Sequence, residues 1–279
     1  MTEAGIEYWQ GWIGREERTS DVLTPELAKR FLATVGEAGD TSVGAVAPAL
    51  IHWCLAQPTV ARDELGVDGH PKKGGFLPPV DLPRRMWAGG KLEILAPFHI
   101  GDTVERLSRI SDVKEKTGRT GRLCFVTVTH ELRVEDAPVL REVHDIVYRE
   151  AATGKSVPSG EQAPRGDANA ELVVDPTLLF RYSALTFNGH RIHYDRPYAT
   201  EVEHYAGLVV HGPLQATLLY NFAATQRGTR PSGFRFRGVS PLCQGPMLLN
   251  AAPANDGALS LWTAAPDGPI AMQAEACWS

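Results

Sequence analysis

A stretch with the composition of a linker divides this chain of 279 residues into two halves. Residues 152–170 are rich in Gly, Pro, Ser and charged side chains and poor in large apolar ones, which is typical of a segment outside a packed core. Helical patterns are followed by strand-like segments both before and after this stretch. The length suffices for two cores. We therefore expect two α+β domains, residues 1–151 and 171–279, joined by the linker 152–170.

Local patterns predict the main elements of each half. Thr24-Pro25-Glu26 predicts the start of a helix that continues to about Gly36. Residues 48–57 are almost wholly apolar, which predicts a second helix buried on all sides. Strands are predicted from alternation and from Val, Ile and Tyr content. The strand-like segments are residues 91–98, 102–116, 122–134 and 137–151 in the first half, and 233–238, 246–252 and 259–264 in the second.

The second half contains a turn that is too polar for a core element. Residues 188–195 read Asn-Gly-His-Arg-Ile-His-Tyr-Asp, and such crowding of polar side chains on a turn indicates a site. Further along, His211-Gly212-Pro213 precedes an apolar run, and proline in a first turn predicts a helix start. Free N–H groups at a helix start, with the positive end of the helix dipole, can stabilise an oxyanion. Gly212 is therefore the candidate oxyanion donor.

The sequence FNGHRIHYDRPYA followed by HGPLQA resembles the hydratase 2 motif of MaoC-like dehydratases, within the hotdog superfamily. The earlier stretch FLPPVDLPRRMWAGGKLEILAPFHIGDTV resembles the first half of such proteins. The likeness is close to the branch of itaconyl-CoA, mesaconyl-C4-CoA and fungal mitochondrial 3-hydroxyacyl-thioester dehydratases. It implies an α+β double hotdog, in which each half has a long central helix wrapped by an antiparallel sheet. It also implies that the second half carries the hydratase motif and that the first contributes mainly substrate contacts.

Hydration of a 2-enoyl thioester needs a base for water, a proton for the α-carbon and donors for the enolate-like oxygen. In the family motif D-x-N-P-x-H, His193 matches the histidine, Asn188 the aspartate, His190 the asparagine and Arg191 the proline. A neutral amide is not a useful base, so three possibilities stay open: His193 works alone, Asp195 substitutes for the missing carboxylate, or His190 shares the task. We favour His193 as the acid/base with Asn188 positioning water or substrate, and place Asp195 second.

Arginines supply the sequence's hint about the substrate. Residues 62–85 form a loop too long to be a mere connector, and it ends in two arginines that can bind a carboxylate or phosphate. The expected substrate contacts are Arg84, Arg85, Trp87, His190, Arg191 and Tyr194. They favour a short dicarboxylic acyl-CoA, and the resemblance implies conversion of itaconyl-CoA or mesaconyl-C4-CoA to citramalyl-CoA. The alternatives are a 3-hydroxyacyl-ACP or acyl-CoA dehydratase of fatty-acid metabolism and a non-catalytic acyl-thioester-binding protein.

Composition narrows the possible partners and surroundings. A net charge of −5 and a pI near 6.0 argue against a general nucleic-acid binder. Four widely spaced cysteines indicate neither a zinc site nor a disulfide scaffold. The early acidic residues argue against a secretory signal, and no stretch reaches the roughly 20 apolar residues that a membrane span requires. We expect a cytoplasmic protein without a bound metal or cofactor, with coenzyme A as part of its substrate, and able to form a homodimer.

Overall fold

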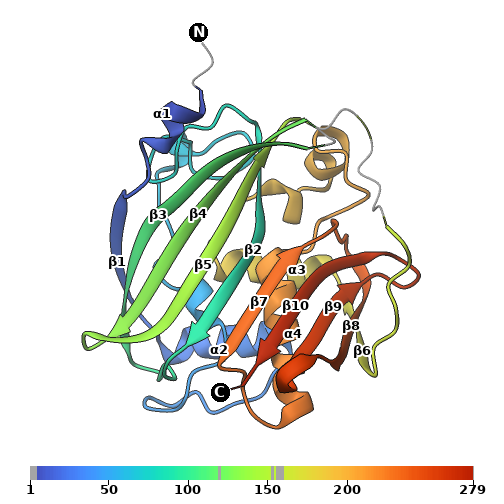
Figure 1. Ribbon diagram of the computed structural model, residues 1–279. Helices are drawn as coiled ribbons and strands as arrows, with labels where there is room; N and C mark the ends of the chain where they lie inside the picture. Colours follow the sequence, from blue (N-terminus) through green and yellow to red (C-terminus); the bar gives the residue numbers. More distant parts are fainter. Residues whose placement is uncertain (1–4, 119–120, 152–153, 155–159, 279) are drawn as a thin grey trace.

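The computed structural model describes residues 5–118, 121–151, 154 and 160–278. The strands of the described residues form one ten-stranded antiparallel sheet in the order β1-β3-β4-β5-β2-β7-β10-β9-β8-β6. Helices α2, α3 and α4 lie behind this sheet in the view of Figure 1. No helix in these ranges is long and apolar enough to cross a lipid bilayer.

The strands are β1 (Glu16–Val22), β2 (Arg84–Ile94), β3 (Thr103–Gly118), β4 (Gly121–Val134), β5 (Ala137–Arg149), β6 (Ala168–Val174), β7 (Gly233–Gly238), β8 (Gly245–Pro253), β9 (Leu259–Ala264) and β10 (Ile270–Cys277). The α-helices are α1 (Ile6–Gln10), α2 (Pro25–Val35), α3 (Pro176–Leu185) and α4 (Gly212–Arg227). The short helical segments are the 3₁₀ turns η1 (Ile51–Cys54), η2 (Arg62–Glu64), η3 (Arg191–His193) and η5 (Asn255–Gly257), and the π-helical segment η4 (Tyr198–Val202).

The two halves of the chain have the same strand order. Read outward from the centre of the sheet, the first half runs β2-β5-β4-β3-β1 and the second β7-β10-β9-β8-β6. The halves meet where β2 pairs with β7, and no helix intervenes between these two strands (Figure 1). The sheet order thus matches the repeated α+β plan that the sequence predicts.

Two glycines of β2 allow the halves to join. Gly89 lies opposite Arg237 and Gly90 opposite Phe236 of β7. A Cβ atom on Gly89 would lie 2.6 Å from the Phe236 carbonyl oxygen, and one on Gly90 would lie 2.8 Å from the Val143 carbonyl oxygen of β5. Close backbone approach therefore requires glycine at both positions.

Most predicted elements are confirmed. Helix α2 is capped at its start by the Thr24 hydroxyl, which accepts the Leu27 amide, and at its end by Gly36 in the left-handed region. Helix α4 begins at Gly212, next to the predicted proline. The predicted strands are present as β2 to β5 and β7 to β9, although β2 starts seven residues earlier, at Arg84 rather than Lys91. Strands β1, β6 and β10 were not predicted.

The helix predicted over residues 48–57 is wrong, because only the four-residue turn η1 forms there. Leu50 and Ala56, on either side of the turn, adopt positive φ angles of 59° and 48°. The Ala56 amide donates to Asp21 Oδ2 of β1 at 2.9 Å, and Arg106 Nη1 donates to the Leu55 carbonyl at 3.3 Å. These backbone groups are therefore bonded to β1 and β3 and not within a helix. All four residues of η1 are buried. The apolar composition therefore reflects burial on every side and not helical periodicity.

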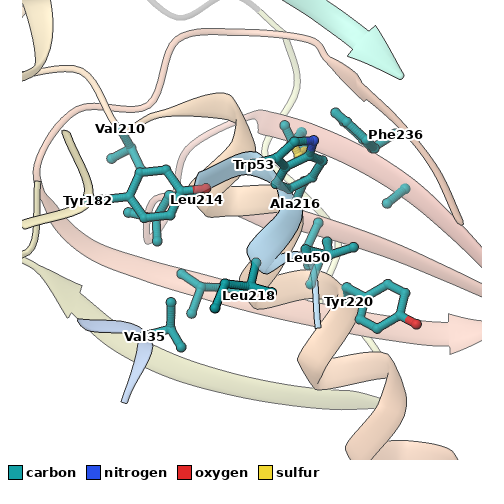
Figure 2. Packing of buried hydrophobic residues seen from close by; sticks show 14 of the residues in the cluster. Val35, Leu50, Trp53, Tyr182, Val210, Leu214, Ala216, Leu218, Tyr220 and Phe236 are labelled. Atoms are coloured by element: carbon teal, nitrogen blue, oxygen red, sulfur yellow. The ribbon is translucent and has the colours of Figure 1, made fainter. Parts of the chain in front are cut away.

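One core joins the two halves around α4. Figure 2 shows Leu214, Leu218 and Tyr220 of α4 packed near Trp53 of η1 and Phe236 of β7, and all five belong to the same buried cluster. Burying each such side chain stabilises the fold by about 1.5–3 kcal/mol. The core thereby fixes the start of α4 relative to the first half.

Candidate active site

The start of α4 presents backbone N–H groups beside residues of the first half. The first amides of a helix have no partner within the helix, and Gly212 is the first residue of α4. Gly212 is partly accessible, and a Cβ placed on it would lie 3.9 Å from Trp87 Cβ of β2. A thioester carbonyl can approach this glycine, as the proposed oxyanion role requires.

His193 is held in a defined orientation on η3. It is 7 % exposed, and its Nδ1 lies 2.7 Å from the Val209 carbonyl oxygen. A carbonyl only accepts hydrogen bonds, so Nδ1 carries the proton and Nε2 is left with a lone pair. Burial lowers the pKa of His193 to about 4, although the hydrogen bond to Val209 opposes this shift. The residue is thus a neutral imidazole with an unprotonated Nε2 at physiological pH.

His211 supports the ring of His193 from the residue before α4. The two rings stack with centroids 3.7 Å apart, and His211 Nε2 lies 2.8 Å from Ser183 Oγ of α3. His211 is fully buried, and its Nδ1 has no hydrogen-bond partner within the described residues. Burial, followed by the neighbouring His193, holds its pKa well below the usual range. His211 therefore stays neutral and orients His193.

The remaining residues of the predicted turn have structural partners. The Asn188 side-chain oxygen accepts the His190 amide at 3.0 Å, and the Tyr194 hydroxyl donates to the Gly189 carbonyl at 2.9 Å. Asp195 accepts two hydrogen bonds from Arg191, at 2.9 and 2.7 Å, and one from the Tyr198 amide. The hydrogen bond from the Tyr198 backbone amide, and then that from the Arg191 guanidinium, hold the pKa of Asp195 below its usual range. These contacts favour a structural role for Asp195.

The three candidate arginines lie in different environments. Arg84 is buried and donates to Glu203 at 2.6 Å and to the Tyr205 hydroxyl. Arg191 is engaged by Asp195 and also donates to the Val67 carbonyl at 3.0 Å. Arg85 has no carboxylate of the described residues within salt-bridge distance. The contacts therefore leave Arg85 as the arginine best placed to meet a substrate.

Arg85 and Trp87 line the first-half side of the site. Arg85 lies opposite Tyr148 of β5 in the antiparallel pair, so both side chains share a face of the sheet. Its charge lowers the pKa of His70 and of His190, in both cases after the larger effect of burial. Trp87 packs on His144 with ring centroids 4.0 Å apart. The first half thus provides a cation and an aromatic wall.

Two further site residues, Asp68 and His70, come from the loop after η2. His70 lies against His190 with ring centroids 4.2 Å apart, and His190 lies 5.4 Å from His193. The sequence pattern did not single out either residue. The only signal was the length of the loop between residues 62 and 85.

The pH dependence of activity tests the state of His193. A base must be neutral, so we expect the acid limb of the kcat/KM profile to lie near pH 4. An imidazole of ordinary pKa, about 6.5, would be largely protonated at pH 5.5. An acid limb near pH 6.5 would contradict the assignment.

This measurement needs a control for acid unfolding. The pKa values of His130, His144 and His193 are lowered by burial to about 3, 4 and 4. Below pH 6.5 the unfolded chain binds more protons than the folded chain, so the fold loses stability as the pH falls. Initial rates should therefore be taken after dilution from neutral stock, with tryptophan fluorescence recording that the protein stays folded.

Solved structures identify the fold. The chain is similar to a MaoC-like dehydratase from Phytophthora capsici, with a TM-score of 0.71, 16% identity and coverage of 99% of each chain. It is also similar to a conserved hypothetical protein from Mycobacterium tuberculosis described as having a double hotdog fold, with a TM-score of 0.56, 13% identity and coverage of 95% of this chain and 96% of the other. The molecule is therefore a double hotdog of the α+β class, as expected, although the buried helix expected in the first half is only the turn η1.

Sequence comparison identifies the family. A family model described as hydroxyacyl-thioester dehydratase type 2 matches residues 50–244. A mesaconyl-C4-CoA hydratase of Chloroflexus aurantiacus is 42% identical over 270 residues, covering 95% of this chain and 96% of the relative. The chain belongs to the hydroxyacyl-thioester dehydratase type 2 family, and its expected class, a hydro-lyase, is confirmed.

Proposed function

We propose that this chain hydrates a short 2-enoyl-CoA thioester that carries a second carboxylate, as mesaconyl-C4-CoA does. The observation that carries the chemistry is the Val209 carbonyl at 2.7 Å from His193 Nδ1, because it leaves Nε2 free to accept a proton. The name of the Chloroflexus relative, which is 42% identical, supports the dicarboxylic substrate. Addition of water to mesaconyl-C4-CoA, with OH on the β-carbon and H on the α-carbon, gives citramalyl-CoA. Itaconyl-CoA, the isomer with the double bond between the β-carbon and a terminal methylene, gives the same product when the proton goes to that methylene.

In the proposed reaction, His193 Nε2 takes a proton from water as the water oxygen bonds to the β-carbon. The electrons of the carbon–carbon double bond move towards the thioester, and the Gly212 N–H stabilises the enolate oxygen. The Asn188 amide, on the same turn, positions the water. A proton then reaches the α-carbon, and the same steps in reverse dehydrate a 3-hydroxyacyl thioester. These steps require no electron transfer and no bound cofactor beyond the coenzyme A of the substrate.

Arg85 is the proposed partner of the free carboxylate. It lies on β2, two residues from Trp87, which packs near Gly212. Arg84 and Arg191 were also expected to bind substrate, but Glu203 and Asp195 engage them. His190 and Tyr194 are secondary substrate contacts in this proposal. His190 offers a buried ring, and the hydroxyl of Tyr194 holds the turn by its hydrogen bond to the Gly189 carbonyl.

Substitution of Arg85 tests the substrate class. We expect Arg85→Gln to lower kcat/KM for mesaconyl-C4-CoA by at least about tenfold, because the carboxylate loses a charged hydrogen-bond partner, while crotonyl-CoA turnover changes less than threefold. Arg235→Gln is the matched control, since Arg235 lies on the neighbouring strand β7 in an exposed pair with Glu275. An equal loss for both thioesters would argue against a carboxylate contact.

The family description also favours a second candidate, dehydration of a 3-hydroxyacyl thioester of fatty-acid metabolism. It uses the same residues in the reverse direction and would be indicated by preference for crotonyl-CoA over the diacid thioesters. We further propose that residues 1–151 mainly contribute substrate contacts and residues 171–279 the chemistry. The linker expected over residues 152–170 ends earlier, because residues 168–170 belong to β6. All four cysteines are free, which supports a reducing compartment such as the cytoplasm.

A further inference from the structure

Asp68 and His70 form a carboxylate–imidazole pair at the edge of the site. Asp68 Oδ2 lies 2.9 Å from His70 Nδ1, and Asp68 Oδ1 accepts the His70 amide at 3.1 Å. Their side chains are only 18 and 21 % exposed. Because the carboxylate accepts at Nδ1, this arrangement leaves His70 Nε2 available to another group.

Backbone contacts fix this pair against the turn that carries His193. The Arg191 amide donates to the Asp68 carbonyl at 2.9 Å. Gly69 has a φ of +87°, and a Cβ placed on it would lie 1.9 Å from the Gly189 carbonyl oxygen. Such a contact is possible only between glycines, so the loop of the first half and the turn of the second are fitted to each other.

The pair faces a row of imidazoles. One ring nitrogen of His70, one of His190 and a carboxylate oxygen of Asp68 all lie within 4.8 Å of one another. His190 in turn contacts His193 with ring centroids 5.4 Å apart and an interplanar angle of 88°. Groups at such distances can exchange a proton through one bridging water.

The family motif has an aspartate at the position of Asn188, so the turn lacks this carboxylate. Asn188 is neutral, and its side-chain oxygen is occupied by the His190 amide. Asp195 is occupied by Arg191 and by the Tyr198 amide. Asp68 is a carboxylate that contacts the histidine row directly.

We propose that the Asp68–His70 pair, supplied by the first half of the chain, is the second proton-transfer unit of this site and compensates for the missing carboxylate at Asn188. This inference rests on the proposed hydration reaction. His193 takes a proton from water, and the α-carbon takes a proton from the His70 imidazolium, which Asp68 stabilises. The proton left on His193 returns to His70 through His190, so both histidines regain their starting states.

The pH profile provides a signature of this role. His70 faces Asp68 on its own loop, Arg85 on β2, and His190 and His193 on the site turn. Burial and Arg85 lower the pKa of His70, whereas Asp68 raises it. Removing the Asp68 charge should therefore move the alkaline limb of the kcat profile to lower pH.

The test compares Asp68→Asn and His70→Gln with wild type. We expect kcat to fall about tenfold in Asp68→Asn and about a hundredfold in His70→Gln, with KM within twofold, consistent with general acid–base contributions. Asp40→Asn is the matched control, because Asp40 likewise accepts from the backbone and side chain of the residue two positions on, Ser42. It should retain wild-type kinetics, and equal melting temperatures would exclude unfolding.

Two results would overturn the inference alone: an active wild type with both variants within twofold of Asp40→Asn, or a stoichiometric metal ion in the wild type that both variants lose. The second result would make these residues ligands. A wild type without turnover of any enoyl thioester would instead overturn the proposed function.

Discussion

Replacing His193 by alanine is expected to lower kcat for enoyl-thioester hydration about a thousandfold, within the range typical of general acid–base groups. The Val209 carbonyl fixes the tautomer of this neutral imidazole, and the stacked His211 fixes the orientation of its ring. Its loss removes the acceptor for the proton of water and leaves the oxyanion donor in place. KM should change less than threefold, because substrate binding does not depend on this nitrogen. The measurement is the loss of enoyl-thioester absorbance over time.

Two variants separate chemistry from folding in this prediction. His193→Gln retains a side-chain donor for Val209 but has no basic nitrogen, so it should be as inactive as the alanine variant. His99→Ala, outside the site in the loop between β2 and β3, should retain full activity. A His193→Gln enzyme with more than a tenth of wild-type kcat would contradict the role of His193 as base.

The largest expected effect on stability is that of Gly89→Val. A Cβ atom at this position would lie 2.6 Å from the Phe236 carbonyl oxygen and 3.1 Å from Arg237 Cα, both backbone atoms that cannot move aside without separating β2 from β7. Because the two halves join there, we expect unfolding free energy to fall by about 3 kcal/mol or more, at the upper end of overpacking effects. Urea denaturation followed by tryptophan fluorescence measures this change.

Gly75→Val is the control for this substitution, because a Cβ on Gly75 would meet nothing within 4 Å and its φ is not in the positive range. It should change unfolding free energy by less than about 0.5 kcal/mol, as surface substitutions usually do. If Gly89→Val unfolded at the same urea concentration as wild type, that result would contradict the close approach of the β2 and β7 backbones at Gly89.

Features coded locally were predictable from the sequence. Pro213 and the apolar run after it gave the start of α4, and Thr24 with Pro25 gave that of α2. The turn from Asn188 to Asp195 was found because its polar residues are consecutive. In each case the determining residues lie within one or two turns of one another.

Features that depend on distant contacts were not predictable. Arg84 was expected to bind substrate, but its partner Glu203 lies 119 residues away. Asp68 and His70 reach the site only because Gly69 meets Gly189 across the two halves. The apolar run around Trp53 resembled a helix, since burial on all sides gives the same composition in a helix and in a short turn. Long-range packing, which no local pattern encodes, decided all three.

The central claim is that this site adds water to a dicarboxylic enoyl-CoA. Its most direct test is the initial rate of hydration of mesaconyl-C4-CoA, itaconyl-CoA and crotonyl-CoA by the purified wild-type chain. The rate is followed by absorbance loss for the two conjugated thioesters and by mass spectrometry of the product for all three. We predict that kcat/KM for one of the diacid thioesters exceeds that for crotonyl-CoA by at least about tenfold, with citramalyl-CoA as the product. Preference for crotonyl-CoA, or no hydration of any of the three, would contradict the claim.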